Sequence, residues 1–115
     1  MYLSKVAQRL KSNSNKRLLD GSKNNNLLEV ESALEEGANI NTRVFDIVDH
    51  NYTPLIYAAK YGYPDVVKFL LSRNADTQLK THRNDWYNAL HWAANNGHLE
   101  VVCLLLDKDR ALINL

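Results

Sequence analysis

Cysteine, glycine and proline are scarce in this 115-residue sequence, which holds one Cys, four Gly and two Pro. The single cysteine, Cys103, excludes an intramolecular disulfide and a zinc site with four cysteine ligands. The glycines form no phosphate-binding loop, and no serine stands in a nucleophile elbow. We therefore expect no catalytic residue, no metal site and no cofactor.

An excess of charge of one sign is also missing, because 14 Lys and Arg stand against 13 Asp and Glu, for a formal net charge of +1. Nucleic acids and anionic membranes usually attract a clustered basic excess, so neither is an expected partner. No apolar run approaches the roughly 18 residues of a membrane-spanning helix. Lys5 and Arg9 interrupt the N-terminal apolar positions, which argues against a secretory signal. We expect a cytoplasmic protein, in the host cytoplasm if the source is a pathogen.

An internal repeat is present in the sequence. Residues 55–71 and 90–106 share a Leu, an Ala-Ala pair, a Gly, a Val-Val pair and a final Leu-Leu pair, all 35 residues apart. A weaker copy over residues 18–34 lies 37 residues before the first of these, with Gly21-Ser22 in place of Ala-Ala. Agreement in one frame without a gap indicates duplication.

Each copy has the pattern of two short helices. Thr53-Pro54 suits the N-cap and first turn of the first helix, and Gly62 suits a left-handed residue at its end. Asp65 opens the second helix, where the helix dipole favours an acid. Gly37 and Asn74 end that helix, since both tolerate positive φ. Such a short pair must stack on a neighbour to bury its apolar face.

Three segments carry motifs of a known family: Thr53-Pro-Leu-Ile-Tyr-Ala-Ala-Lys-Tyr-Gly, Asn88-Ala-Leu-His-Trp-Ala-Ala-Asn-Asn-Gly and Gly37-Ala-Asn-Ile-Asn. They resemble ankyrin repeats over about residues 18–115, although Ile56 stands where the family usually has His. The resemblance implies an all-α fold, an ankyrin-repeat solenoid of about three helix-turn-helix units with projecting hairpin-like turns. The expected organisation is an N-terminal helix and linker over 1–17, then repeats at about 18–50, 51–85 and 86–115.

The resemblance also implies a function without catalysis, namely binding of another protein through the turns and the concave face of the first helices. Candidate partner-binding residues at those positions are Asp49, His50, Tyr52, Tyr57, Lys60, Tyr61, Asp85, Trp86, Tyr87, Trp92, Asn95 and Asn96. Tyr and Trp are enriched at interface hot spots, which favours the aromatic members as anchors. The alternative for Tyr57 and Trp92 is that they pack between repeats.

Two other functions remain open. The chain is either a non-catalytic targeting module of a larger protein, such as a pathogen effector, or a self-associating structural unit. Self-association would use the apolar C-terminal end, at Leu104, Leu105, Leu112 and Ile113.

Histidine and cysteine positions favour structural or solvated roles. His91 and His98 stand where the ankyrin pattern places His, so the resemblance implies hydrogen bonds between neighbouring turns. His50 and His82 fall in the connecting turns, where they are free to contact a partner. Cys103 falls on an outward helix position, so we expect a free surface thiol.

Both ends of the chain, and one turn, leave alternatives open. Residues 2–10 form an amphipathic helix that either caps the stack or binds a partner, and Ser12–Asn15 is expected to break it. The last helix, over 99–108, is as apolar as an internal one, and 111–115 resembles the start of another turn. We expect further repeats, a partner or a second copy to cover this end. The apolar turn Val44–Val48 either tucks inward or forms an exposed patch.

Overall fold

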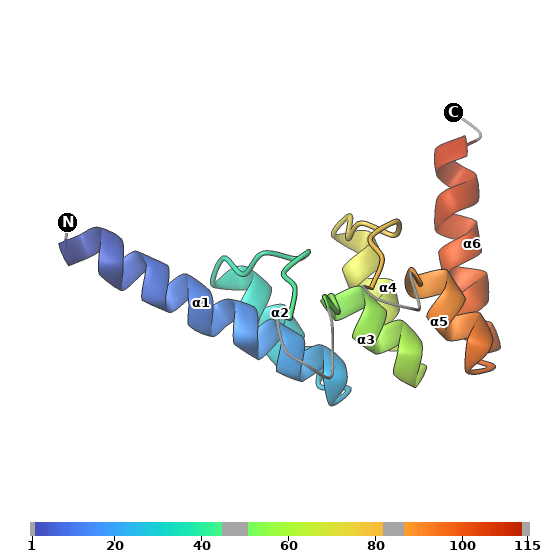
Figure 1. Ribbon diagram of the computed structural model, residues 1–115, viewed down its shortest axis with the longest axis horizontal. Helices are drawn as coiled ribbons and strands as arrows, with labels where there is room; N and C mark the ends of the chain where they lie inside the picture. Colours follow the sequence, from blue (N-terminus) through green and yellow to red (C-terminus); the bar gives the residue numbers. More distant parts are fainter. Residues whose placement is uncertain (1, 45–50, 82–86, 114–115) are drawn as a thin grey trace.

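The computed structural model describes residues 2–44, 51–81 and 87–113, and these ranges contain helices and turns but no strand. The helices are α1 (Tyr2–Lys23), α2 (Leu27–Glu35), α3 (Pro54–Tyr61), α4 (Pro64–Ser72), α5 (Ala89–Asn95) and α6 (Leu99–Ile113). Figure 1 shows three helix pairs that follow one another along the long axis. The first helices α1, α3 and α5 contact one another in order, as do the second helices α2, α4 and α6. The predicted all-α solenoid of about three units is confirmed.

Local signals in the sequence set the helix ends as predicted. Thr53 Oγ1 accepts a hydrogen bond of 3.1 Å from Ile56 N at the start of α3, and Gly62 ends this helix at a φ of +74°. Asn88 is the corresponding N-cap of α5 in the next repeat, and its Oδ1 accepts a 3.0 Å bond from His91 N. His91 Nδ1 in turn accepts from Asn88 N at 3.2 Å. The predicted bond from His91 to a neighbouring turn is therefore wrong, since its ring caps its own helix.

Most of the buried side chains lie in the middle repeat, which has a neighbour on each side. Ile56 is 1% exposed, and Ala58 and Ala59 are fully buried where α3 meets the flanking first helices. Val67 and Leu70 on α4 are also fully buried. Burying one branched side chain of this size stabilises the fold by about 1.5–3 kcal/mol. Ile56 thus packs in the core at the position where its counterpart His91 caps the first helix of the next repeat.

Backbone hydrogen bonds join the two ends of each connecting turn, between Val44 and Tyr52 and between Thr81 and Tyr87. Val44 N donates to Tyr52 O at 3.0 Å and Asn51 N donates to Val44 O at 2.9 Å, while Thr81 N donates to Tyr87 O at 2.9 Å. The turns are thus hairpin-like where the structure describes them. Val44 packs against the core. The candidate residues Asp49, His50, Asp85 and Trp86, as well as His82 and 45–48 of the apolar turn, lie outside the described residues.

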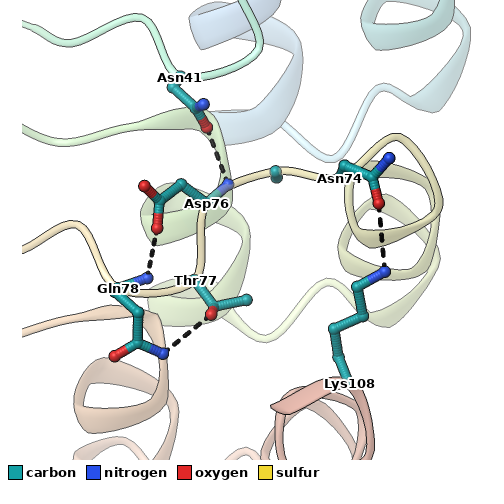
Figure 2. A pocket seen from close by; sticks show the side chains of 7 residues that line it. Asn41, Asn74, Asp76, Thr77, Gln78 and Lys108 are labelled. Atoms are coloured by element: carbon teal, nitrogen blue, oxygen red, sulfur yellow. Dashed lines mark hydrogen bonds between the residues drawn. The ribbon is translucent and has the colours of Figure 1, made fainter. Parts of the chain in front are cut away.

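Asparagine side chains bond to the backbone of the turns that follow the second helices α2 and α4. Asn15 Oδ1 accepts from Asn39 N at 2.7 Å, and Asn41 Oδ1 accepts from Asp76 N at 2.9 Å. Figure 2 shows the second of these links beside a pocket of about 420 Å³, together with the bond of 2.8 Å from Gln78 N to Asp76 Oδ1. Asn15 thus ties α1 to the turn that follows α2, and Asn41 joins the first repeat to the second.

The predicted break at Ser12–Asn15 is wrong, because α1 runs through it without interruption from Tyr2 to Lys23. Ser14 is only 3% exposed, and its hydroxyl donates to Leu10 O at 3.0 Å within the helix. Asn15 is used in the bond to Asn39 N. A bond within the helix satisfies Ser14 and a tertiary bond satisfies Asn15, so neither side chain competes with the helix backbone.

The predicted turn at the C-terminal end is also wrong, since α6 continues past Lys108 to Ile113. The second helices α2 and α4 are followed by Gly37 at a φ of +97° and Asn74 at a φ of +63°. The corresponding residue of the third repeat is Asp109, which remains helical. Its carboxylate accepts a 2.9 Å bond from Thr77 Oγ1. Without a residue that favours positive φ, the helix does not stop there.

Candidate functional site

Four aromatic side chains of the second and third repeats form one cluster, the aromatic patch, which consists of Tyr52, Tyr57, Tyr61 and Trp92. The ring centroid of Tyr52 lies 5.1 Å from that of Tyr57 and 5.5 Å from that of Trp92. Tyr57 and Tyr61 are four residues apart on α3, so they share one helix face and stack at 6.4 Å. Trp92 reaches the cluster from α5. The patch therefore spans the junction of two repeats.

Lys60 places a positive charge inside the aromatic patch. Its ammonium nitrogen lies 4.8 Å from the Trp92 centroid, 4.9 Å from that of Tyr52 and 5.6 Å from that of Tyr61. The same nitrogen donates a hydrogen bond of 3.1 Å to the Tyr52 hydroxyl. All three rings are within the roughly 6 Å at which a cation is attracted to a ring face. Lys60 is thus held in one place on the patch.

The aromatic patch has a buried base and an exposed rim. Tyr52 and Tyr57 are 6% and 3% exposed, whereas Trp92 is half-buried and Tyr61 is 37% exposed. The alternative of packing between repeats describes Tyr57, which is part of the core, and in part Trp92, which packs against the core and against Tyr52 of the preceding repeat. The surface that a partner can reach is therefore Tyr61, Lys60 and part of Trp92, with the two buried tyrosines beneath.

The other predicted site residues on α5 and its turn adjoin the aromatic patch. Tyr87 is half-buried, with its ring edge-on to Trp92 at 5.3 Å. Asn95 is exposed, and exposed Asn96 donates a 3.1 Å bond to Lys60 O. His98 Nε2 also bonds to Lys60 O, at 2.9 Å, which confirms the predicted bridge between repeats. Asn96 and His98 therefore fix the third repeat against the backbone of Lys60.

Two residues of the patch surroundings, Lys23 and Tyr63, were missed by the sequence prediction. The Lys23 ammonium lies 5.7 Å from the Tyr57 centroid, and the Tyr63 hydroxyl donates to Lys23 O at 3.2 Å. A signal for Lys23 was available, because it precedes Lys60 by the same 37 residues that separate the first two repeats. Each lysine lies over an aromatic ring of the repeat that follows it.

Trp92 Nε1 is buried and has no hydrogen-bond acceptor among the described residues. An unmet buried donor costs about 1–3 kcal/mol. The indole ring nevertheless lies against Tyr52, Tyr87 and the Lys60 ammonium. Aromatic and cationic contacts hold Trp92 in the patch.

Over the described ranges, no three His, Cys, Asp or Glu side chains come together to hold a metal ion. Cys103 is an exposed free thiol, as predicted. None of the described helices is both long and apolar enough to cross a membrane. The aromatic patch itself offers apolar area and one fixed cation, which suit non-covalent binding.

Comparison with known proteins identifies the repeats. A family model described as ankyrin repeats, in three copies, matches residues 18–115. An ankyrin repeat-containing protein of Arabidopsis thaliana is 37% identical over 60 residues, 52% of this chain and 12% of that protein. A transient receptor potential cation channel subfamily A member 1 homolog of Caenorhabditis elegans is 43% identical over 61 residues, 51% of this chain and 5% of the channel. The chain thus spans a small part of these relatives. It belongs to the ankyrin repeat family.

Proposed function

We propose that this chain is a non-catalytic module that binds another protein through the aromatic patch and the adjoining turns. Ankyrin repeats are generally protein-interaction modules, so the family supports binding of a protein as the kind of function. The patch is the feature of this chain that supports the location. Exposed Tyr61 and half-buried Lys60 and Trp92 stand on the fixed base of Tyr52 and Tyr57.

The order already present in the patch favours tight binding. Lys60 contacts three rings and a tyrosine hydroxyl, and two bonds from the third repeat hold its backbone carbonyl. Immobilising a flexible side chain on binding costs about 0.5–1.5 kcal/mol. Since contacts within the chain already restrain Lys60, a smaller part of that cost falls on the complex.

Capture from a lysate of the source or host tests this proposal. The chain is compared with a Tyr61→Ala/Asn95→Ala variant, which changes exposed Tyr61 of the patch and exposed Asn95, the counterpart of Lys60 on α5. A control variant is Leu28→Ala, 78% exposed on α2. Circular dichroism first checks that all three remain folded. We expect a protein that the parent and control retain and the patch variant loses. A partner retained equally by all three places the site elsewhere.

A second candidate function is a targeting module of a larger protein, for which the relatives provide support. The matched segment is 6% of the glycerophosphocholine phosphodiesterase of Candida albicans, at 38% identity over 74 residues and 64% of this chain. In such proteins a short repeat segment accompanies much longer sequence. If the same holds here, the gene encodes further domains, and fusing this chain to a reporter relocates the reporter in cells.

A third candidate function is self-association through the outer face of α6. Leu106 is 40% exposed, whereas Leu71, its counterpart 35 residues earlier, is covered by the next repeat and is 6% exposed. Leu105, which the sequence suggested as a contact, is fully buried, so that assignment is wrong. The side chains of Leu112 and Ile113 lie outside those that the structure describes. Sedimentation should show dimers that Leu106→Glu abolishes, whereas a parent that stays monomeric at high concentration removes this candidate.

We propose the cytoplasm as the location, because Cys103 is an exposed free thiol that a reducing compartment preserves. Fluorescence microscopy of the tagged protein in its source cell tests this, and signal confined to an oxidising compartment contradicts it.

A further inference from the structure

We propose that the aromatic patch recognises a carboxylate group of the partner protein, and that Lys60 is the residue that pairs with it. This inference rests on the proposed binding function and adds the chemistry of the ligand. The Lys60 ammonium carries a positive charge, lies among three aromatic rings, and uses one of its donors for the Tyr52 hydroxyl.

The Lys60 ammonium lacks an ionic partner in the part of the chain that the structure describes. The ion pairs found there join Arg17 to Glu29 and Glu36, and Lys68 to Glu100. Of the three N–H donors of Lys60, one is used by the Tyr52 hydroxyl at 3.1 Å. The ammonium is therefore fixed and half-buried, and it retains donors for an acceptor that approaches from the partner.

The contacts of Lys60 decide between an anionic and a cationic ligand. Faces of aromatic rings attract cations, and clusters of such rings can bind a cationic ligand. Here the ammonium of Lys60 already lies 4.8–5.6 Å from the rings of Tyr52, Tyr61 and Trp92. A cationic side chain of a partner would have to displace Lys60, whereas a carboxylate adds to the arrangement that exists. The patch therefore fits an acidic ligand.

The neighbouring repeat places a second lysine against the aromatic patch. Lys23 occupies the position 37 residues before Lys60 and lies over Tyr57, one repeat along the stack. Exposed Asp20 is in the same helix, and no ion pair joins it to Lys60. Both lysines contact rings of the aromatic patch, Lys23 that of Tyr57 and Lys60 those of Tyr52, Tyr61 and Trp92. A partner segment with an acidic residue next to apolar or aromatic residues complements the patch.

Charge reversal at Lys60 provides the sharpest test. A display library of random linear peptides is selected separately against the parent, against Lys60→Glu and against Lys68→Glu. The control changes the net charge equally but lies on α4, where Lys68 is 56% exposed and 4.0 Å from Glu100. We expect Asp and Glu to be enriched among peptides selected by the parent and the control. Lys60→Glu should lose this enrichment and select Lys and Arg instead.

Two more conservative variants keep the test valid even if Lys60→Glu fails to fold. The affinity of one selected acidic peptide is measured by fluorescence anisotropy for the parent, Lys60→Gln and Lys60→Arg, after circular dichroism. Removing a charged hydrogen-bond partner weakens binding by roughly 10- to 100-fold, so we expect that loss for Lys60→Gln. Lys60→Arg keeps the charge and should retain most of the affinity. Binding by the parent should weaken as salt is raised.

Other results overturn the inference in distinguishable ways. Selected peptides without acidic enrichment, or an acidic peptide whose affinity is unchanged by Lys60→Gln, contradict the role of Lys60 while the binding function stands. Basic peptides that bind more tightly to Lys60→Gln would show that the rings prefer an external cation. If no peptide is selected by any version of the chain, the carboxylate inference is wrong and the proposed binding function also loses support.

Discussion

Substitution of Gly62 by alanine tests how the second and third repeats are held together. Gly62 ends α3 at a φ of +74°, and a Cβ added there would overlap the imidazole ring of His98. Gly97 is its counterpart one repeat later, at a φ of +73°, and a Cβ there would meet nothing within 4 Å. The two positions share the same backbone conformation and differ in the contact with His98. Gly97→Ala is therefore a matched control for Gly62→Ala.

The expected losses of stability can be worked out from these surroundings. A side chain in the left-handed region costs about 1–2 kcal/mol, which applies to both variants. In Gly62→Ala the ring of His98 must also move away from Lys60 O, to which it bonds at 2.9 Å. Loss of that hydrogen bond costs about a further 1 kcal/mol. We expect the free energy of unfolding to fall by about 1–2 kcal/mol in Gly97→Ala and by about 2–3 kcal/mol in Gly62→Ala.

Urea unfolding followed by circular dichroism measures both losses. A double-mutant cycle with His98→Ala then isolates the contact, because without the imidazole ring the alanine at position 62 has space. In that background the cost of Gly62→Ala should fall to that of Gly97→Ala. Equal losses for the two single variants, or no coupling between positions 62 and 98, would refute the reasoning.

Further predictions concern burial, charge and the aromatic patch. Leu105→Ala should lower the free energy of unfolding by about 2–5 kcal/mol, because Leu105 is fully buried, whereas Leu106→Ala, at 40% exposed, should cost less than about 1 kcal/mol in the same urea titration. Arg17→Ala should lower the melting temperature, because its guanidinium pairs with Glu29 and Glu36, and calorimetry should show a smaller difference near 1 M salt. Tyr61→Ala should lower the free energy of unfolding in urea by about 0.5–1.5 kcal/mol, because its ring stacks on Tyr57, and should weaken partner capture.

Features that depend on a few neighbouring residues were predictable from the sequence. Thr53 and Gly62 mark the two ends of α3, and Gly37 and Asn74 follow the second helices with positive φ, as expected. The recurring Ala-Ala and Val-Val pairs marked the second and third repeats, and the weaker copy over residues 18–34 marked the first. These signals are local, so one sequence contains them in full.

The errors arose where contacts between distant residues override local preference. Ser14 and Asn15 favour a break by composition, yet burial of Ser14 and the bond from Asn39 N to Asn15 keep α1 intact. Asp109 lies where a turn was expected, but it bonds to Thr77 and remains helical. Neither partner can be identified from the residues next to each position.

The residues of the candidate site were predictable from the sequence, but the burial of each side chain was not. Positions of the first helices identified Tyr57, Lys60, Tyr61 and Trp92, and the structure brings all four together. The sequence could not separate buried Tyr57 from exposed Tyr61, because that depends on how closely the repeats stack. The position of Lys60 among three rings likewise requires side-chain directions from two repeats.

Site-specific photo-crosslinking tests the central claim most directly, namely that a protein partner binds on the face formed by the aromatic patch. A photoreactive residue is placed at exposed Tyr61 or Asn95 on the patch side, and at exposed Lys68 or Cys103 on the second helices. We expect crosslinks to a partner from positions 61 and 95, and none from 68 and 103. Crosslinks from 68 and 103 alone would contradict the claim and place binding on the opposite helix layer.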